Sequence, residues 1–318
     1  MPGGPAPGAR GPSRLKLVID ISAGVGPGGV ARLQSGAVPV SLREVIAALD
    51  ARYDPALAES WDAVGLVCGD PDEPVSRVLF AVDPTSPVVD EAIAIGAHLL
   101  VTHHPLLLTP VHGVPADDPK GRLVHRLVRA GTALFVAHTN ADRAPDHGVN
   151  DALASAVGLE DTVPLEPVAG DPRAGLGRIG RLGESLSLRG FGERVAGVLP
   201  VTVGGVRIAG DPDRPVRTVA VCGGSGGSLH RVAAAAGADV LLTSDLKHHS
   251  VSEGLESGGP ALCDVAHFAT EWPWLPVAAD VLRRDLSDRE EVAVSGRRTD
   301  PWTWHVGQHG DPAGRPTG

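Results

Sequence analysis

The chain has 318 residues, of which 42% are hydrophobic and 21% are charged, which is usual for a globular protein with a sizeable core. The formal net charge of −10 argues against nucleic acid as a partner, because a surface that coats nucleic acid needs clustered Lys and Arg. The three cysteines form no CxxC pair, so we predict no disulfide framework, no Cys-rich zinc site and a cytoplasmic location.

The two ends of the chain differ in composition from its middle. Residues 1–37 are rich in Gly, Pro, Arg and Ser without an apolar period, so we expect a disordered leader there. We place the folded region at residues 38–286 and a flexible, polar tail at residues 287–318. No apolar run reaches the roughly 18–20 residues that a membrane span needs, so we expect no membrane partner.

The first half of the folded region alternates strands and helices. Ser41 and Glu44 have the spacing of a capping box at the start of a helix. A second helix is expected between Ser86, as its capping residue, and Gly96, as its stop signal. Strands that alternate with helices indicate parallel pairing. Further strands are predicted at residues 78–83, 99–101 and 133–137, with a helix at residues 119–130.

The second half repeats this pattern. The run Gly96-Ala97-x-x-Leu100-x-Thr102 matches Gly237-Ala238-x-x-Leu241-x-Thr243, which indicates an internal repeat. We therefore expect an α/β fold of two related lobes with mixed, largely parallel sheets. Strands are predicted at residues 201–208, 217–221, 238–243 and 261–265. The predicted lobes are residues 38–158 and 215–286, with a connector at residues 159–214.

Histidines and carboxylates follow the predicted strands at equivalent places. His103 and His104 come directly after one strand, and Pro105 prevents further pairing. The third strand of each half ends in a His that is followed four residues later by a carboxylate. These pairs are His138 with Asp142 and His267 with Glu271. Each motif alone is also compatible with a solvated turn, but convergence of the two lobes would bring all these side chains into one cleft.

Three imidazoles and two carboxylates suit Zn²⁺, Fe²⁺ or Mn²⁺ better than Ca²⁺. The expected ligands are His103, His104, Asp142, His267 and Glu271. Five ligands are too many for a closed tetrahedral site and match two divalent ions that share a carboxylate. Two neighbouring ions of this kind are an arrangement for hydrolysis.

Several motifs together resemble the dinuclear-metal-centre family called GTP cyclohydrolase 1 type 2 homologs, or Nif-three-like proteins. The resemblance covers residues 39–286 and implies the same five ligands, two related lobes and a toroidal hexamer. The chain is similar to the short form without an inserted middle domain. Ser244 departs from the Gly usual in the family, and the motif His best matches His249. The motifs are Trp61–Leu66, Thr102–Pro105, His138–Asp142, Gly148–Asp151, Thr243–Lys247 and His267–Glu271.

Two functions from different classes follow. The first is a metal-dependent hydrolase acting on a small nucleotide-like substrate, with His138 or His249 moving protons. The second is a non-catalytic, metal-stabilised hexameric scaffold or regulatory interaction protein. Five protein ligands for two ions leave positions open to water, which favours the first. The glycine-rich run 223–227 is equally compatible with a phosphate-binding loop and with a tight connection.

Overall fold

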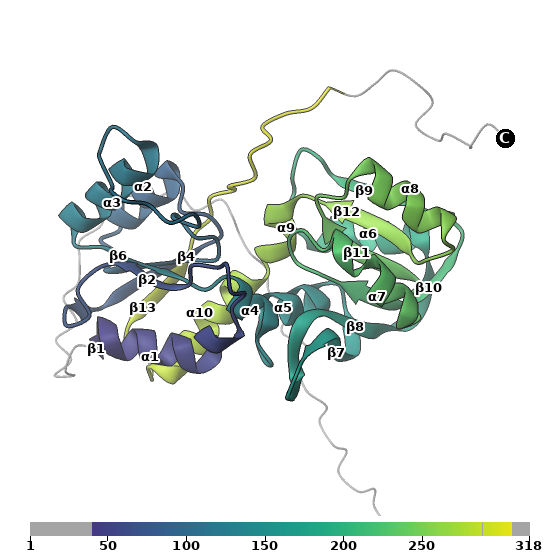
Figure 1. Cartoon of the computed structure of the whole chain (residues 1–318), viewed down its shortest axis with the longest axis horizontal. Helices are drawn as coiled ribbons and strands as arrows, with labels where there is room; N and C mark the ends of the chain where they lie inside the picture. Colours follow the sequence, from purple (N-terminus) through teal and green to yellow (C-terminus); the bar gives the residue numbers. More distant parts are fainter. Residues whose placement is uncertain (1–39, 288, 307–318) are drawn as a thin grey trace, which may run out of the picture. The chain divides into compact units, whose positions relative to one another are not determined.

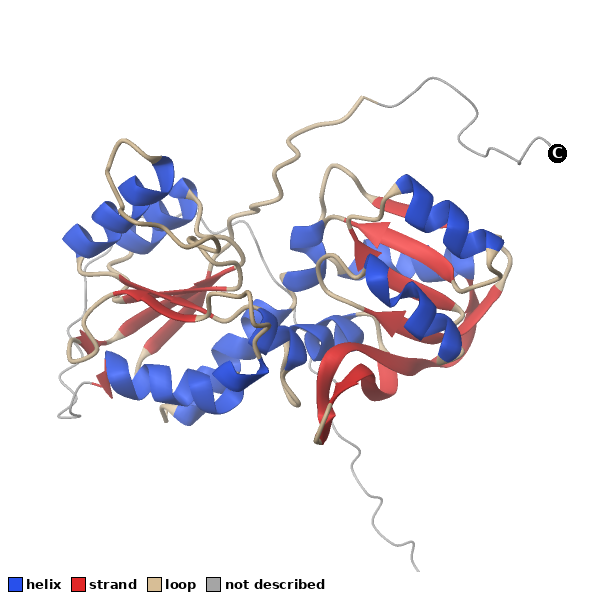
Figure 2. Ribbon diagram, viewed as in Figure 1, coloured by secondary structure: helices blue, strands red, loops and turns tan. Residues whose placement is uncertain are grey.

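The computed structural model describes residues 40–287 and 289–306, so the predicted leader at residues 1–37 lies outside the described residues. The described part is an α/β fold with two mixed sheets, as expected, and helices cover both faces of each sheet (Figure 1, Figure 2). A short two-stranded ribbon pairs β1 (Val40–Ser41) with β3 (Pro74–Val75). None of the described helices combines the length and apolar composition needed to cross a membrane.

The first sheet has five strands and is mostly parallel. The neighbouring pairs β13–β4, β4–β5 and β5–β6 are parallel, and β2 lies antiparallel to β6 at one edge. All residues of β5 and β6 are buried, which is the reason that these strands are continuous apolar runs. In spatial order the strands are β13 (Glu291–Val294), β4 (Arg77–Ala81), β5 (Leu99–Thr102), β6 (Ala133–Val136) and β2 (Gly65–Cys68).

The second sheet has six strands and is less parallel than the sequence predicted. Only β10, β11 and β12 pair in parallel, whereas β7, β8 and β9 are antiparallel to their neighbours. In spatial order the strands are β7 (Leu159–Val168), β8 (Asp171–Ser187), β10 (Pro215–Val221), β11 (Val240–Ser244), β12 (Ala261–Val265) and β9 (Val206–Ala209). Strand β9 begins later than the strand expected at residues 201–208.

Residues 159–214, predicted as a connector with one strand at residues 201–208, supply three strands, β7, β8 and β9, to this sheet. Strand β8 was not predicted because it is rich in glycine, which normally weakens strands. Here its glycines are required by close approach of β7. A Cβ atom at Gly175 would lie 2.4 Å from the Glu166 carbonyl oxygen, and one at Gly180 would lie 2.8 Å from the Glu160 carbonyl oxygen.

The helices begin largely where the sequence places them. Ser41 and Glu44 form the predicted capping box of α1, whereas α2 begins at Ser86 itself, with Thr85 as its N-cap residue in place of the predicted Ser86. The helices are α1 (Leu42–Arg52), α2 (Ser86–Ala94), α3 (Pro119–Ala130), α4 (Thr139–Arg143), α5 (Val149–Ala156), α6 (Leu188–Val198), α7 (His230–Ala235), α8 (His248–Glu256), α9 (His267–Glu271) and α10 (Trp274–Asp285). Two 3₁₀ turns cover Pro55–Leu57 and Gly227–Leu229.

Each sheet buries alternate residues on opposite faces. In the first sheet, Leu79 and Leu100 pack with residues of α2 and α3, whereas the intervening Phe80 and Val101 pack with residues of α1 and α10. Figure 2 shows these two pairs of helices on opposite faces. Helix α10 follows the strands of the second sheet but packs on the first, and its first residue, Trp274, is completely buried there. Helix α9, just before α10, contributes Phe268 to the same core cluster.

The predicted flexible tail at residues 287–318 is wrong for its first part. Strand β13 (Glu291–Val294) pairs in parallel with β4, and Val292 is buried. The Ser295 N–H then donates to the Phe80 carbonyl at 2.8 Å. The segment is too short to show a local period, and it is ordered by the backbone hydrogen bonds that the edge of β4 offers.

Candidate metal centre

The candidate ligands leave strands that lie beside one another. His103 and His104 follow β5, and His138 follows the neighbouring β6. From the second sheet, β12 leads into α9, whose first and last residues are His267 and Glu271. The carboxyl ends of parallel strands are where open α/β sheets collect ligands. In both sheets the site residues therefore follow the carboxyl ends of parallel strands.

All five predicted ligands come together around the carboxylate of Glu271. Its Oε1 lies 2.8 Å from His267 Nε2 and 3.4 Å from His103 Nε2, and its Oε2 lies 3.1 Å from His104 Nε2. His103 Nε2 also lies 3.7 Å from Asp142 Oδ1. Glu271 is 3% exposed, so this cluster is buried at its centre. Side chains from both halves of the sequence thus meet in one place.

Two overlapping groups of side chains have the spacing to hold a metal ion. The ligand atoms of His103, His104 and His138 lie within 4.8 Å of one another, as do those of His104, His267 and Glu271. His104 belongs to both groups. His138, predicted to be a proton-moving residue, therefore lies among the atoms that can bind an ion.

His249, the second residue predicted to move protons, is placed differently. It lies exposed on α8, where its ring is 5.2 Å from the ring of His248. Within the described residues, none of the contacts that join the cluster involves His249. Its catalytic role stays a prediction.

A hydrogen-bond acceptor lies at Nδ1 of each imidazole in the cluster. When Nδ1–H donates to this acceptor, Nε2 is left with its lone pair free for a metal ion, which is the usual way that proteins orient a ligating histidine. The contacts are His103 Nδ1 to Ala137 O at 2.9 Å, His104 Nδ1 to Asp83 Oδ1 at 2.7 Å, His138 Nδ1 to Asp62 Oδ1 at 2.8 Å and His267 Nδ1 to Asp245 Oδ2 at 2.7 Å.

The three aspartates in these contacts had no predicted role. Asp62 and Asp245 appeared only as members of motifs, and Asp83 was not singled out. A signal was nevertheless present, because Asp83 follows β4, the neighbour of β5, and Asp245 follows β11, the neighbour of β12. The sequence signal for such a residue is therefore an aspartate that directly follows one strand, when the neighbouring strand in the sheet is followed by a site histidine.

Three buried polar atoms of the cluster have no hydrogen-bond partner: His103 Nε2, Asp142 Oδ1 and Glu271 Oε2. Glu271 Oε2 is close to His104 Nε2, but the contact lacks hydrogen-bond geometry. Buried polar atoms without partners are rare in proteins. Nitrogen and oxygen atoms that converge without partners are the donor set of a divalent transition-metal ion, so the residues fit the predicted group.

The carboxylates also control the protonation of the metal-free cluster. Burial by itself lowers the pKa of His104, but Glu271 and Asp83 outweigh it and raise the pKa to about 11. Burial is likewise outweighed at His267, where Glu271 and Asp245 raise the pKa to about 9. The pKa of Glu271 lies well below its ordinary value because the imidazoles overcome the effect of burial. Without metal, protons therefore provide the positive charge that balances Glu271.

The glycine-rich run 223–227 is a tight connection next to the cluster. Three of its N–H groups already donate to side chains, namely Gly223 to Asn150 Oδ1, Gly224 to Thr270 Oγ1 and Gly226 to Thr243 Oγ1. Gly224 has φ +64°, and a Cβ atom there would lie 2.6 Å from Glu271 Oε1. These internal bonds argue against the phosphate-loop alternative and show that glycine is needed to admit Glu271.

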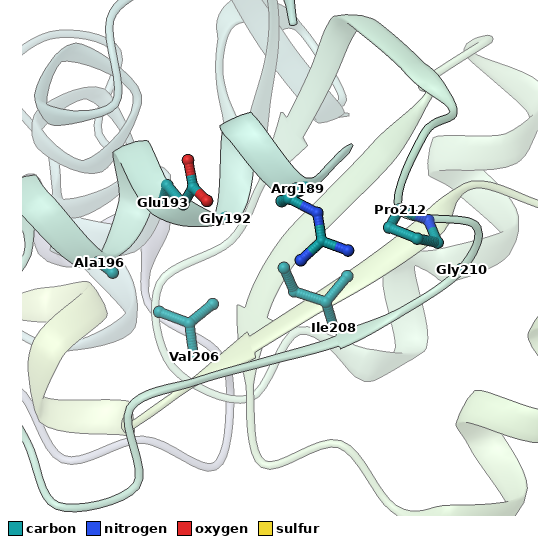
Figure 3. A pocket seen from close by; sticks show the side chains of 8 residues that line it. All are labelled: Arg189, Gly192, Glu193, Ala196, Val206, Ile208, Gly210 and Pro212. Carbon is teal, nitrogen blue, oxygen red and sulfur yellow. The ribbon is translucent and has the colours of Figure 1, made fainter. Parts of the chain in front are cut away.

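The surface cavity in Figure 3 lies elsewhere, between α6 and β9, and has a volume of about 580 Å³. It is lined mainly by small and apolar side chains, with one arginine and one glutamate, and contains none of the clustered histidines. This cavity therefore brings together fewer groups that could bind a metal ion or take part in catalysis than the candidate metal centre does. The lining residues are Arg189, Gly192, Glu193, Ala196, Val206, Ile208, Gly210 and Pro212.

The sequence pattern of the family Duf34/NIF3 (NGG1p interacting factor 3) matches residues 40–301, nearly all of the described part. The chain belongs to this family. A family member from Streptomyces coelicolor, named GTP cyclohydrolase 1 type 2 homolog, is 54% identical over 271 residues, covering 83% of this chain and 94% of the relative. The crystal structure of a Bacillus cereus protein related to NIF3 matches with a TM-score of 0.78 and 25% identity, covering 85% of this chain and all of that one.

A third relative, from Mycobacterium tuberculosis, is also named GTP cyclohydrolase 1 type 2 homolog and is 38% identical. Its alignment covers 83% of this chain and 97% of the relative but runs over 369 positions, more than this chain contains. That relative therefore carries residues that this chain lacks, in agreement with the predicted short form.

Proposed function

We propose that this protein is a metal-dependent hydrolase that acts on a small, nucleotide-like substrate and holds two divalent ions per chain. The observation that carries the proposal is the convergence of imidazole Nε2 atoms on the buried carboxylate of Glu271, with each Nδ1 placed against an acceptor. The name shared by the relatives, GTP cyclohydrolase 1 type 2 homolog, supports a nucleotide as the substrate class.

The ions proposed are Zn²⁺, Fe²⁺ or Mn²⁺, because imidazole and carboxylate donors without a thiolate suit these metals. Bound ions supply a Lewis acid that activates water and stabilises negative charge on the substrate. The centre is also accessible, since the side chain of His104 is 23% exposed and that of His267 is 34% exposed. The proposed ligands are His103, His104, Asp142, His267 and Glu271.

His138 is the residue proposed to move protons. Its Nδ1 lies 2.8 Å from Asp62 Oδ1, and the Asp62 carboxylate also accepts a hydrogen bond from the Thr139 N–H at 3.0 Å. Burial raises the pKa of Asp62, but the hydrogen bonds from His138 and Thr139 outweigh this effect and hold the pKa well below its ordinary value. The Asp62 carboxylate orients the imidazole so that Nε2 of His138 is free to take a proton from water and return it to a leaving group.

The proposal is tested by screening nucleoside mono-, di- and triphosphates, GTP among them, with protein loaded separately with each metal. Chelator-treated protein and the His104→Ala variant are the controls. We expect hydrolysis only by the metal-loaded parent protein. A protein that carries two ions per chain but hydrolyses none of these compounds would contradict the enzyme proposal and favour the metal-stabilised scaffold.

We also propose that the chain forms a homo-oligomer, with the hexamer implied by the family resemblance as the expected state. Several large apolar side chains are more than half exposed, including Val128 at 60% and Val201 at 82%, and assembly would shield such groups from water. Light scattering at micromolar concentration measures the mass directly. A monomer mass would contradict this proposal.

A further inference from the structure

A large aromatic side chain lies exposed beside the metal centre. Trp61 is 58% exposed, yet its ring contacts that of His138 edge-on, with the ring centroids 6.1 Å apart. The His138 ring in turn contacts the rings of His103 and His104, at 5.2 and 5.6 Å. One imidazole therefore separates the exposed indole from two candidate ligands.

The position of Trp61 is determined by its neighbours in the chain. The adjacent Asp62 has a fully buried side chain that is hydrogen-bonded to His138 and Thr139. The Asp62 N–H donates to the Glu59 carbonyl at 3.0 Å, and the Glu59 N–H donates to Thr139 Oγ1 at 2.9 Å. Glu59 also forms an ion pair with Arg143 on α4. These bonds anchor the segment to the site, although the indole itself buries less than half of its surface.

An anchored but exposed indole next to a metal centre is suited to binding a flat ring. Aromatic side chains stack on nucleic-acid bases, and this stacking tolerates any base because every base presents a π-face. We propose that Trp61 is the stacking surface for a planar heteroaromatic ring in the substrate. This inference rests on the proposed function for the nucleotide class of the ligand, and it adds a specificity-determining residue to that site.

The test compares two probes that differ only in the ring. Guanosine 5′-monophosphate and ribose 5-phosphate carry the same sugar and phosphate, so metal–phosphate contacts are common to both. Calorimetric titration of the Mn²⁺-loaded protein should show tighter binding of guanosine 5′-monophosphate. Trp61→Ala should weaken that binding about tenfold and leave ribose 5-phosphate unchanged, whereas Trp61→Phe should keep most of the affinity.

Trp304 provides a matched control, because it is 73% exposed and is absent from the contacts of the cluster. Trp304→Ala should leave binding of both probes unchanged. Equal affinity of the parent protein for the two probes would overturn the proposal, and so would unchanged binding of guanosine 5′-monophosphate by Trp61→Ala. If Trp61→Ala instead lowers the oligomer mass without affecting that binding, the indole is a contact between chains and the proposal is wrong.

These outcomes are separate from those for hydrolysis. Base-dependent binding through Trp61 without hydrolysis of any nucleotide would leave the stacking site in place and contradict the enzyme proposal. Hydrolysis of nucleotides together with nucleotide binding that is unchanged in Trp61→Ala would support the enzyme proposal and contradict the stacking site.

Discussion

Asn150 accepts a hydrogen bond from the backbone N–H of Gly223 at 2.8 Å. Its amide nitrogen donates to the backbone carbonyl of Asp142 at 2.9 Å. Asn150 is fully buried on α5, and it therefore ties the segment that carries Asp142 to the glycine-rich run beside Glu271. The Asn150 side chain thus connects backbone segments from the two halves of the site.

Asn150→Ala should lower both stability and metal content. The change leaves the buried Gly223 N–H without its partner, which typically costs about 1–3 kcal/mol, and it releases the Asp142 backbone. Urea unfolding of the metal-free protein measures the first effect, and elemental analysis of the purified protein measures the second. Glu253→Ala, at an exposed position on α8, is the control. An unfolding midpoint equal to that of the parent would contradict the assigned role of Asn150.

His104→Ala and Glu271→Ala should each lower metal content, with the larger loss in Glu271→Ala. The reason is that the Glu271 carboxylate lies within 3.4 Å of Nε2 atoms on His103, His104 and His267. Elemental analysis gives the number of ions per chain, and the exposed His249→Ala should match the parent. Full occupancy in both site variants would defeat the ligand assignment.

His138→Ala distinguishes catalysis from metal binding. If the residue moves protons, the variant should lose most turnover and keep both ions, because the five proposed ligands remain. Loss of an ion together with turnover would instead make His138 a ligand, as its spacing from His103 and His104 allows. Parent-level turnover and metal content would count against any role for His138.

Metal binding should release protons at pH 7. In the metal-free protein the pKa of His267 is about 9 and that of His104 is about 11, so both imidazoles are charged at this pH and must lose protons to bind an ion. Calorimetry in two buffers of different ionisation enthalpy measures the release. Binding without proton release at pH 7 would show that the imidazoles are not the ligands.

The same raised pKa values predict how the stability of the metal-free protein depends on pH. Because the folded-state pKa values exceed the reference value of 6.5, the stabilisation from these charged imidazoles is complete below pH 6.5. It is lost as the pH rises through 9 for His267, and further towards 11 for His104. Thermal unfolding from pH 6 to pH 10 should therefore show a falling midpoint, with a smaller fall in His104→Ala.

Thr299 should influence the metal centre although it belongs to the segment predicted to be a flexible tail. Its hydroxyl donates to Asp83 Oδ2, while Asp83 Oδ1 lies against His104 Nδ1. Thr299→Val removes this support and should weaken metal affinity by roughly 2- to 10-fold, the usual value of one hydrogen bond. Thr299→Ser keeps the hydroxyl and should bind as the parent does. Equal metal affinity in all three proteins would show that the contact is irrelevant to His104.

Features that depend on neighbours in sequence could be predicted from the sequence. The buried strands β5 and β12 are short apolar runs because both of their faces are covered, and each is followed by its site histidine or leads directly to it. The spacing of His267 and Glu271 needs only one turn of α9. The repeated pattern in the two halves then indicated which of the histidines belonged together.

Strand β8 could not be predicted in the same way. Its glycines at positions 175 and 180 indicate a break in a strand when they are considered locally, whereas the structure needs them because β7 approaches within contact distance. Whether such a glycine interrupts or permits a strand depends on the neighbouring strand.

The sequence by itself determined the types of donor in the centre and the strand ends that carry them, because apolar runs and residue spacing are local properties of the chain. Only the tertiary structure decided which oxygen atom orients each imidazole. Asp83 reaches His104 from a neighbouring strand, Asp245 reaches His267, and Thr299 reaches Asp83 from the far end of the chain. Such pairs are set by strand order and by packing between distant segments, and no period along the sequence records them.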